Sequence, residues 1–77
     1  MKYYRVNERG DMSSFSVYDG RKKKWINKGF MLKGQLFTER EYKKMGVIKW
    51  ACDEIELKKN RVKVYSDGAR YERGVWF

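Results

Sequence analysis

The sequence contains no histidine and only one cysteine, Cys52. Histidine is the usual general base near neutral pH and the commonest metal ligand, so its absence argues against hydrolytic or metal-dependent catalysis. One cysteine cannot form an internal disulfide, and without a second cysteine or a histidine it cannot build a zinc site. We expect Cys52 to be a small buried apolar residue, and we predict no catalytic residue, no metal and no cofactor.

Proline is also absent, and so are long apolar runs. No stretch approaches the ~18–20 apolar residues of a membrane span, and the N-terminus has no apolar signal core. We therefore expect a cytoplasmic protein without a membrane partner. Glycine-rich phosphate loops, helix-turn-helix patterns and zinc fingers are missing from the sequence as well.

Positive charge and aromatic rings are abundant. Nineteen Lys and Arg against ten Asp and Glu give a net charge of +9, which attracts polyanions. Aromatic residues make up 17% of the chain and are spread along its length, as in a folded rather than a disordered protein. At 77 residues the chain is expected to form one domain, 1–77, with a small core.

One segment carries a complete helix start and stop. Thr38 followed three residues later by Glu41 is a capping box, in which each side chain accepts a hydrogen bond from the backbone N–H of the other residue. Gly46 supplies the C-terminal stop. The pattern predicts a short helix over about 38–45.

The same helix carries three cations, Arg40, Lys43 and Lys44, together with two glutamates. Opposite charges at i,i+3 and i,i+4 spacing are typical of a solvated helix face. We interpret these residues as an ordinary exposed surface.

Alternating segments before the helix predict strands. Residues 2–7 and 14–18 could pair as a hairpin, and the Asp19-Gly20 dipeptide favours a tight turn into a following strand. That strand is expected to begin near Trp25, and residues 27–29 predict a second bend before a further short strand at 30–32.

Further alternation follows the helix. Residues 54–58 and 61–65 predict two strands, with Val62 and Val64 of the second one facing inward. Residues 66–68 give a second hairpin signal. The coarse order predicts an α+β domain, with a small antiparallel sheet of about four to six short strands, arranged as hairpins, and one short helix packed on it.

The most unusual stretch, residues 21–33, has six cations and no acidic residue, with Trp25 inside it. Cations neutralise phosphates and an aromatic face stacks on an unpaired base, which is how single-stranded nucleic acid is commonly held. The alternative is a solvated turn with Trp25 in the core. A second cationic cluster surrounds a later predicted turn, and the two would form one patch if they projected from the same sheet edge. The candidate nucleic-acid or partner-binding residues are Arg21, Lys22, Lys23, Lys24, Trp25, Lys28, Lys58, Lys59, Arg61 and Lys63.

An enzymatic alternative rests on few residues. Glu54 and Glu56 share one face of a predicted strand, where paired carboxylates could act as acid and base. With Arg70 and Tyr71 they form the one plausible polar constellation. We expect them instead to balance neighbouring lysines across strands, and we predict that the protein is not an enzyme.

Three stretches resemble small, uncharacterised proteins encoded in the early regions of phages and prophages of Gram-positive bacteria. They are residues 32–42, residues 55–60, and Tyr65 with residues 68–71, within roughly the last three-fifths of the chain. In that group the tail often has an aromatic pair followed by Phe-Gly-Ala-Arg-Phe, whereas residues 66–67 here are Ser-Asp and the chain continues past the corresponding position.

The resemblance implies a context rather than a chemistry, because the group has no assigned activity. Small phage proteins are usually binders that redirect a host process, regulate phage genes or block a defence complex. We therefore expect a non-enzymatic accessory protein of the host bacterial cytoplasm that binds nucleic acid or a nucleoprotein complex. The alternative is a direct inhibitor of a host replication or transcription factor, or of a defence nuclease of the CRISPR type, with aromatic residues as interface anchors. The oligomeric state is left open.

Overall fold

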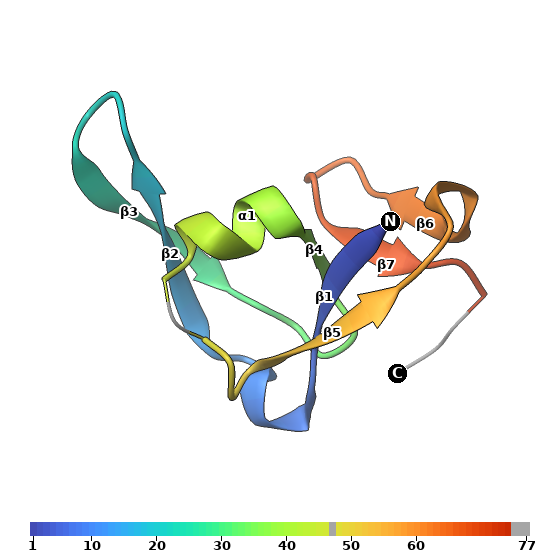
Figure 1. The fold of residues 1–77 in the computed structure, drawn as a ribbon. Coiled ribbons are helices and arrows are strands. Elements are labelled where there is room, and N and C mark those ends of the chain that lie inside the picture. Colours follow the sequence, from blue (N-terminus) through green and yellow to red (C-terminus); the bar gives the residue numbers. More distant parts are fainter. Residues whose placement is uncertain (47, 75–77) are drawn as a thin grey trace.

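The computed structural model describes residues 1–46 and 48–74, which form an α+β fold (Figure 1). Five strands build one antiparallel sheet, in the order β5-β1-β4-β7-β6, and β2 and β3 form a separate two-stranded ribbon. The elements are β1 (Lys2–Val6), η1 (Glu8–Gly10), β2 (Ser14–Asp19), β3 (Lys24–Phe30), β4 (Leu36–Thr38), α1 (Glu39–Lys44), β5 (Cys52–Glu56), η2 (Lys59–Arg61), β6 (Val62–Val64) and β7 (Arg70–Glu72), where η denotes a short 3-10 helix.

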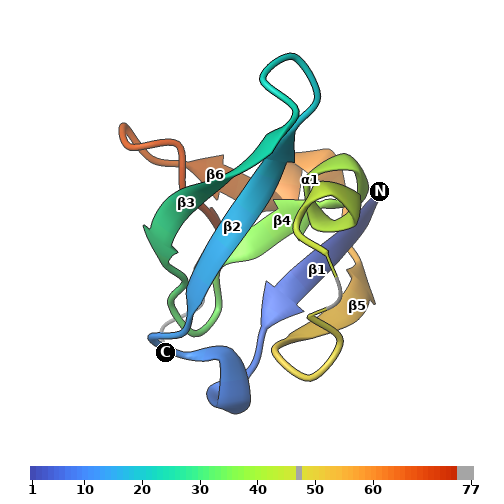
Figure 2. The same cartoon turned by 90° about the vertical axis from the view of Figure 1, so that its left-hand side faces the viewer.

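The ribbon and α1 lie on the same face of the five-stranded sheet (Figure 2). The core between these layers contains six buried residues, and Phe15 and Val17 from the ribbon pack against it. Cys52 is among them, with 4% of its surface exposed, so its predicted burial is confirmed. The core residues are Val6, Met31, Phe37, Met45, Ala51 and Cys52.

The predicted helix and its caps are confirmed. The Thr38 hydroxyl oxygen accepts from the backbone N–H of Glu41, and a Glu41 carboxylate oxygen accepts from the backbone N–H of Thr38 at 3.0 Å. Met45 caps the other end, and Gly46 follows with a φ of +74°, a conformation that favours glycine.

The predicted hairpin between 2–7 and 14–18 is wrong. β1 pairs with β4 on one side and β5 on the other, whereas β2 pairs only with β3 among the described residues. The intervening segment does not turn back on itself. The Asn7 side-chain oxygen accepts from the N–H groups of Arg9 and Gly10, and the Asn7 backbone N–H donates to Ala51. These bonds tie the end of β1 to the start of β5 and direct the chain away from β1.

The hairpin after Asp19 is present, with a longer turn than predicted. The Asp19 carboxylate accepts from the N–H groups of Arg21 and Lys22, and Lys23 has a φ of 52°. The bend predicted at 27–29 is instead a bulge inside β3, where the register shifts so that Lys28 has no partner on β2. β3 ends at Phe30, so the predicted strand at 30–32 is also wrong.

The second hairpin, between β6 and β7, is confirmed. Val64, predicted to face inward, is 60% exposed. β6 is a three-residue strand at the sheet edge, and the ribbon and α1 pack over other strands. Among the residues that the structure describes, no helix is long and apolar enough to cross a membrane.

Candidate nucleic-acid interface

The β2–β3 ribbon projects from the body of the molecule and carries the most basic part of the chain at its end (Figure 1). We call Arg21, Lys22, Lys23 and Lys24 the basic tip. All four are exposed, and within residues 1–46 and 48–74 none of them has a carboxylate partner. The Asp19 carboxylate of this turn is engaged by the backbone N–H groups of Arg21 and Lys22, so the four side-chain charges are exposed to solvent.

Trp25 is a surface residue, with 55% of its area exposed. Its ring meets that of Tyr18, its cross-strand neighbour, edge to face with centroids 5.4 Å apart. Trp25 also lies against Gly46, where an added Cβ would come within 3.4 Å of the indole. The aromatic side chain is thus supported from behind and partly open, which suits stacking on a flat ligand.

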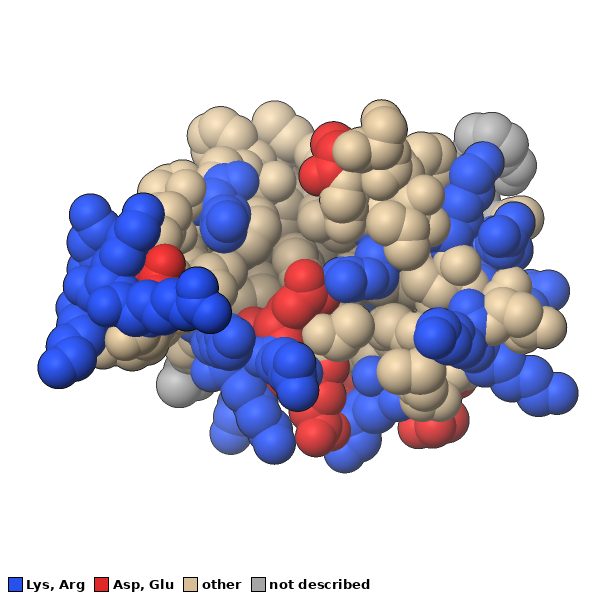
Figure 3. Space-filling model, turned by 90° about the horizontal axis from the view of Figure 1, so that it is seen from above, with Lys and Arg blue, Asp and Glu red and all other residues tan. Residues whose placement is uncertain are grey.

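The second cationic cluster lies near η2 and β6, at the opposite end of the molecule from the basic tip (Figure 1). It consists of Lys58, Lys59, Arg61 and Lys63. Viewed from above, cations gather at both ends of one face, and carboxylates, uncharged residues and a few further cations lie between them (Figure 3). Arg61 of this cluster is 3.8 Å from a Glu72 carboxylate, and the Lys63 ammonium lies 5.1 Å from the centre of the Tyr65 ring. The two clusters therefore form separate patches.

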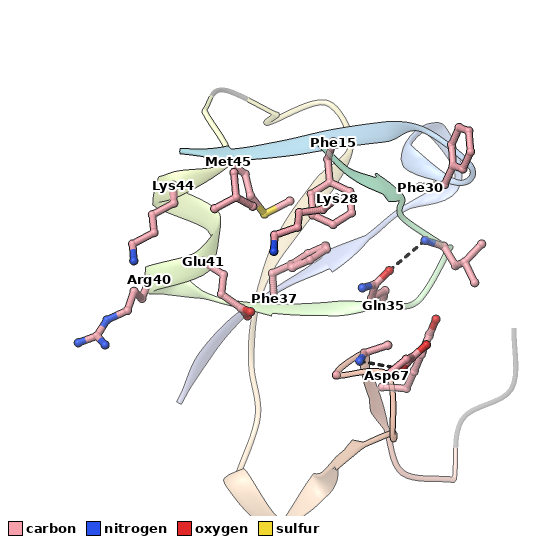
Figure 4. Close-up of a pocket in the computed structure, with 15 residues that line it drawn as sticks. Phe15, Lys28, Phe30, Gln35, Phe37, Arg40, Glu41, Lys44, Met45 and Asp67 are labelled. Carbon is pink, nitrogen blue, oxygen red and sulfur yellow. Dashed lines mark hydrogen bonds between the residues drawn. The ribbon is translucent and has the colours of Figure 1, made fainter. Parts of the chain in front are cut away.

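A groove between the ribbon and the β6–β7 turn was not anticipated. It has a volume of about 460 Å³, and α1 forms one end of it (Figure 4). Aromatic rings from four elements line it, and three cations, Lys28, Arg40 and Lys44, lie around them. The aromatic lining residues are Phe15, Phe30, Phe37 and Tyr71.

The acidic groups of this groove and the side-chain oxygen of Gln35 are already engaged. Glu41 pairs with Arg70 and caps the helix, and the Asp67 carboxylate accepts from the N–H of Ala69 at 3.0 Å. The side-chain amide oxygen of Gln35 accepts from the backbone N–H of Leu32 at 3.1 Å. These bonds hold the acceptors within the protein.

The three groove cations, unlike the acidic groups, are not paired: none has a carboxylate partner within the described part of the chain. Lys43, by contrast, lies 3.4 Å from Glu39. Only Lys28 was predicted as a site residue, and Arg40 and Lys44 were interpreted as an ordinary helix face. The sequence signal for Arg40 and Lys44 as site residues was their i,i+4 spacing, which places two cations side by side on one helix face with no acidic residue between them there.

The polar constellation considered for an enzyme is not assembled. Glu54 and Glu56 lie on β5, whereas Arg70 and Tyr71 lie on β7, and β1 and β4 separate these strands. Three strand spacings of about 4.8 Å place them about 14 Å apart. Glu54 accepts from the Tyr4 hydroxyl at 3.4 Å, and Glu56 lies 3.1 Å from the N-terminal ammonium.

Cys52 does not have the environment of a reactive thiol. Burial, followed by the neighbouring Asp53 charge, raises its pKa to about 11. A neutral thiol is a poor nucleophile and a poor metal ligand. Within residues 1–46 and 48–74, no group of three potential metal ligands comes together.

Comparison with protein-family models, curated proteins and solved structures finds no match to this chain.

Proposed function

We propose that this protein binds nucleic acid, alone or within a nucleoprotein complex, through the basic tip of the β2–β3 ribbon. The observation that carries the proposal is the set of four adjacent, exposed and unpaired cations at the end of a projecting ribbon, next to the half-exposed Trp25. We further propose a non-enzymatic accessory role of phage type in the bacterial cytoplasm, in line with the resemblance noted above.

The shape of the ribbon supports this proposal. Two strands about 4.8 Å apart make a narrow arm, and a DNA major groove of ~12 Å admits a two-stranded ribbon. Cations that reach phosphates release condensed counterions, which gives binding that weakens steeply with salt. Trp25 and Tyr18 would add stacking where the bases are unpaired.

Fluorescence anisotropy with short single- and double-stranded DNA and RNA at several salt concentrations tests the proposal. The variant Lys22→Ala, Lys23→Ala, Lys24→Ala removes three tip charges, and Lys58→Ala, Lys59→Ala, Lys63→Ala is its matched control. Each variant lowers the net charge from +9 to +6. If the tip contacts phosphates, only the first variant should lose affinity, with a log–log salt slope shallower by about 2–3. Equal losses of affinity in both variants would mean that binding depends on net charge alone, and would contradict a site at the basic tip.

A second candidate is direct binding to a host or defence protein. Three large apolar side chains near the base of the ribbon, Met12, Phe30 and Leu32, are exposed. The Met12 N–H donates to the Met31 carbonyl at 2.8 Å, so the two chain segments that carry these side chains lie side by side. Exposed apolar groups of this kind are typical interface anchors. A stable complex with one host protein that survives nuclease treatment would favour this candidate over the first.

A further inference from the structure

The groove between the ribbon and the β6–β7 turn has an apolar floor and aromatic sides. Phe37 and Met45 are buried at its base, and the Phe15 ring meets that of Phe37 edge to face at 5.3 Å. Phe30 stands at the end of the groove away from α1, with 65% of its surface exposed (Figure 4). A large aromatic side chain exposed at the rim of a concave apolar surface is poised to pack against a flat ligand.

Cations surround this apolar floor. Arg40 and Lys44 lie at the α1 end, and Lys28 lines the groove from the ribbon (Figure 4). Lys28 reaches this place because the β3 bulge inserts it as an extra residue. The groove thus combines a stacking surface with unpaired positive charge.

A second hollow connects the groove with the basic tip. It has a volume of about 530 Å³ and shares Val17, Lys28 and Lys44 with the groove, and it extends along the ribbon to Arg21. Arg21, Lys28 and Lys44 therefore line one path from the tip to the groove. The Asp19 carboxylate also lines it, with an oxygen that accepts from the backbone N–H groups of the turn. A continuous polyanion bound at the tip would be led along this path.

Gln35 supplies a polar group of a different kind. Because its side-chain oxygen accepts from the Leu32 N–H, its amide N–H groups are left to donate elsewhere. An aromatic surface, a free amide donor and flanking cations match the face, the edge and the phosphates of an unpaired nucleotide. A duplex keeps its bases stacked, so it has no free base face to place against the aromatic rings of the groove.

We infer that the groove is a subsite for an unpaired nucleotide of a single strand, whose base packs against Phe30 and whose phosphates are held by Lys28, Arg40 and Lys44. This inference rests on the proposed function and makes it more specific. The basic tip supplies affinity for any nucleic acid, and the groove supplies preference for single strands.

The variant Phe30→Ala tests this subsite, and Val64→Ala is its matched control. Both residues are largely exposed, at 65% and 60%, so neither change should disturb folding, and Val64 lies on β6, outside the groove. Binding is measured by fluorescence anisotropy on three probes: a single strand of about 8 nucleotides, the same strand without its bases, and the duplex. The length of about 8 nucleotides lies within the usual site size of single-strand binding proteins.

We expect Phe30→Ala to weaken single-strand binding about 5- to 150-fold, which corresponds to the ~1–3 kcal/mol of one stacked base. Duplex binding and the abasic strand should be unaffected by this change, and Val64→Ala should match the wild type on all three probes. The Leu32 methyl resonances should shift on adding the single strand but not the abasic strand, because Leu32 lines the groove two residues along the chain from Phe30.

Three results would overturn the inference. One is equal affinity of Phe30→Ala and wild type for the intact strand. Another is an equal loss on single strand and duplex. The third is displacement of the single strand by an acidic peptide that shifts the Leu32 methyl resonances as the strand does, which would make the groove a protein-binding site. If the tip variant loses binding while Phe30→Ala does not, the proposed function stands and only the subsite fails. Absence of binding to every nucleic acid at low salt would overturn both.

Discussion

The ring of Tyr42 on α1 stacks on the ring of Tyr4 on β1, with centroids 3.8 Å apart and planes within 2° of parallel. This stack joins α1, the one α-helix among the described residues, to β1, which lies between β4 and β5 in the sheet. The helix has only six residues, too few to be stable alone. Its position beside the groove therefore depends on such tertiary contacts and on its caps.

Tyr42→Leu should lower the free energy of unfolding by about 0.5–1.5 kcal/mol, because it keeps an apolar side chain but removes the aromatic pair. Tyr42→Phe keeps the ring and should differ from the wild type by less than about 0.5 kcal/mol. Urea denaturation followed by circular dichroism measures both. Equal stability of the Leu and Phe variants would show that the stack contributes no more than its burial.

Thr38→Ala should destabilise the protein by about 1 kcal/mol, since it removes the hydroxyl that accepts from the Glu41 N–H. Thr38→Ser retains the acceptor and is the matched control. Urea midpoints at constant m-value provide the measurement. If the Ser variant loses as much as the Ala variant, the methyl group rather than the cap accounts for the effect.

Gly10→Ala should cost about 1–3 kcal/mol, the usual range for overpacking. A Cβ at Gly10 would lie 2.5 Å from the Ala51 carbonyl oxygen and 2.8 Å from the Ala51 Cβ, so η1 or the start of β5 would have to move. Gly20→Ala is the control, because nothing lies within 4 Å of a Cβ there. Thermal and urea unfolding should therefore separate the two variants clearly. A Gly10→Ala variant as stable as Gly20→Ala would mean that η1 or the start of β5 can move to accommodate the methyl group at little cost in stability.

What could be predicted from the sequence was local. The capping box of Thr38 and the hairpin before β7 depend on residues a few positions apart, and both are present. The partners of β1 could not be predicted, because they follow from long-range pairing with β4 and β5 while turn residues nearby suggested a simpler hairpin.

The same distinction applies to the candidate site. The basic tip is contiguous in sequence, so its charge was evident before the structure. The groove was not, because Lys28, Arg40 and Tyr71 come from β3, α1 and β7 and meet only in the fold. The bulge that inserts Lys28 was misread as a bend, since glycine and asparagine serve both structures.

Stability should fall as the pH rises from about 9 to about 11, because of Cys52. Burial raises the pKa of this thiol to about 11, against an ordinary value of 9.0. Over that interval the unfolded chain releases the proton while the native protein retains it, so the native state binds more protons and loses stability with increasing pH. The rise of the Cys52 pKa from 9.0 to about 11 corresponds to about 2–3 kcal/mol of unfolding free energy. This stabilisation is fully present below pH 9 and is lost near pH 11.

Cys52→Ala is the variant that isolates this effect. It removes the titrating group from a site that is only 4% exposed, and the packing that it loses adds no pH dependence of its own. Urea unfolding at pH 7, 9, 10 and 11 should therefore show curves for wild type and variant that converge as the pH rises. Burial, followed by the Cys52 charge, raises the pKa of Tyr42, so both proteins are compared in a Tyr42→Phe background. Parallel curves across this range would mean that the thiol ionises as readily in the native protein as in the unfolded chain, and that Cys52 is less enclosed than its position in the core implies.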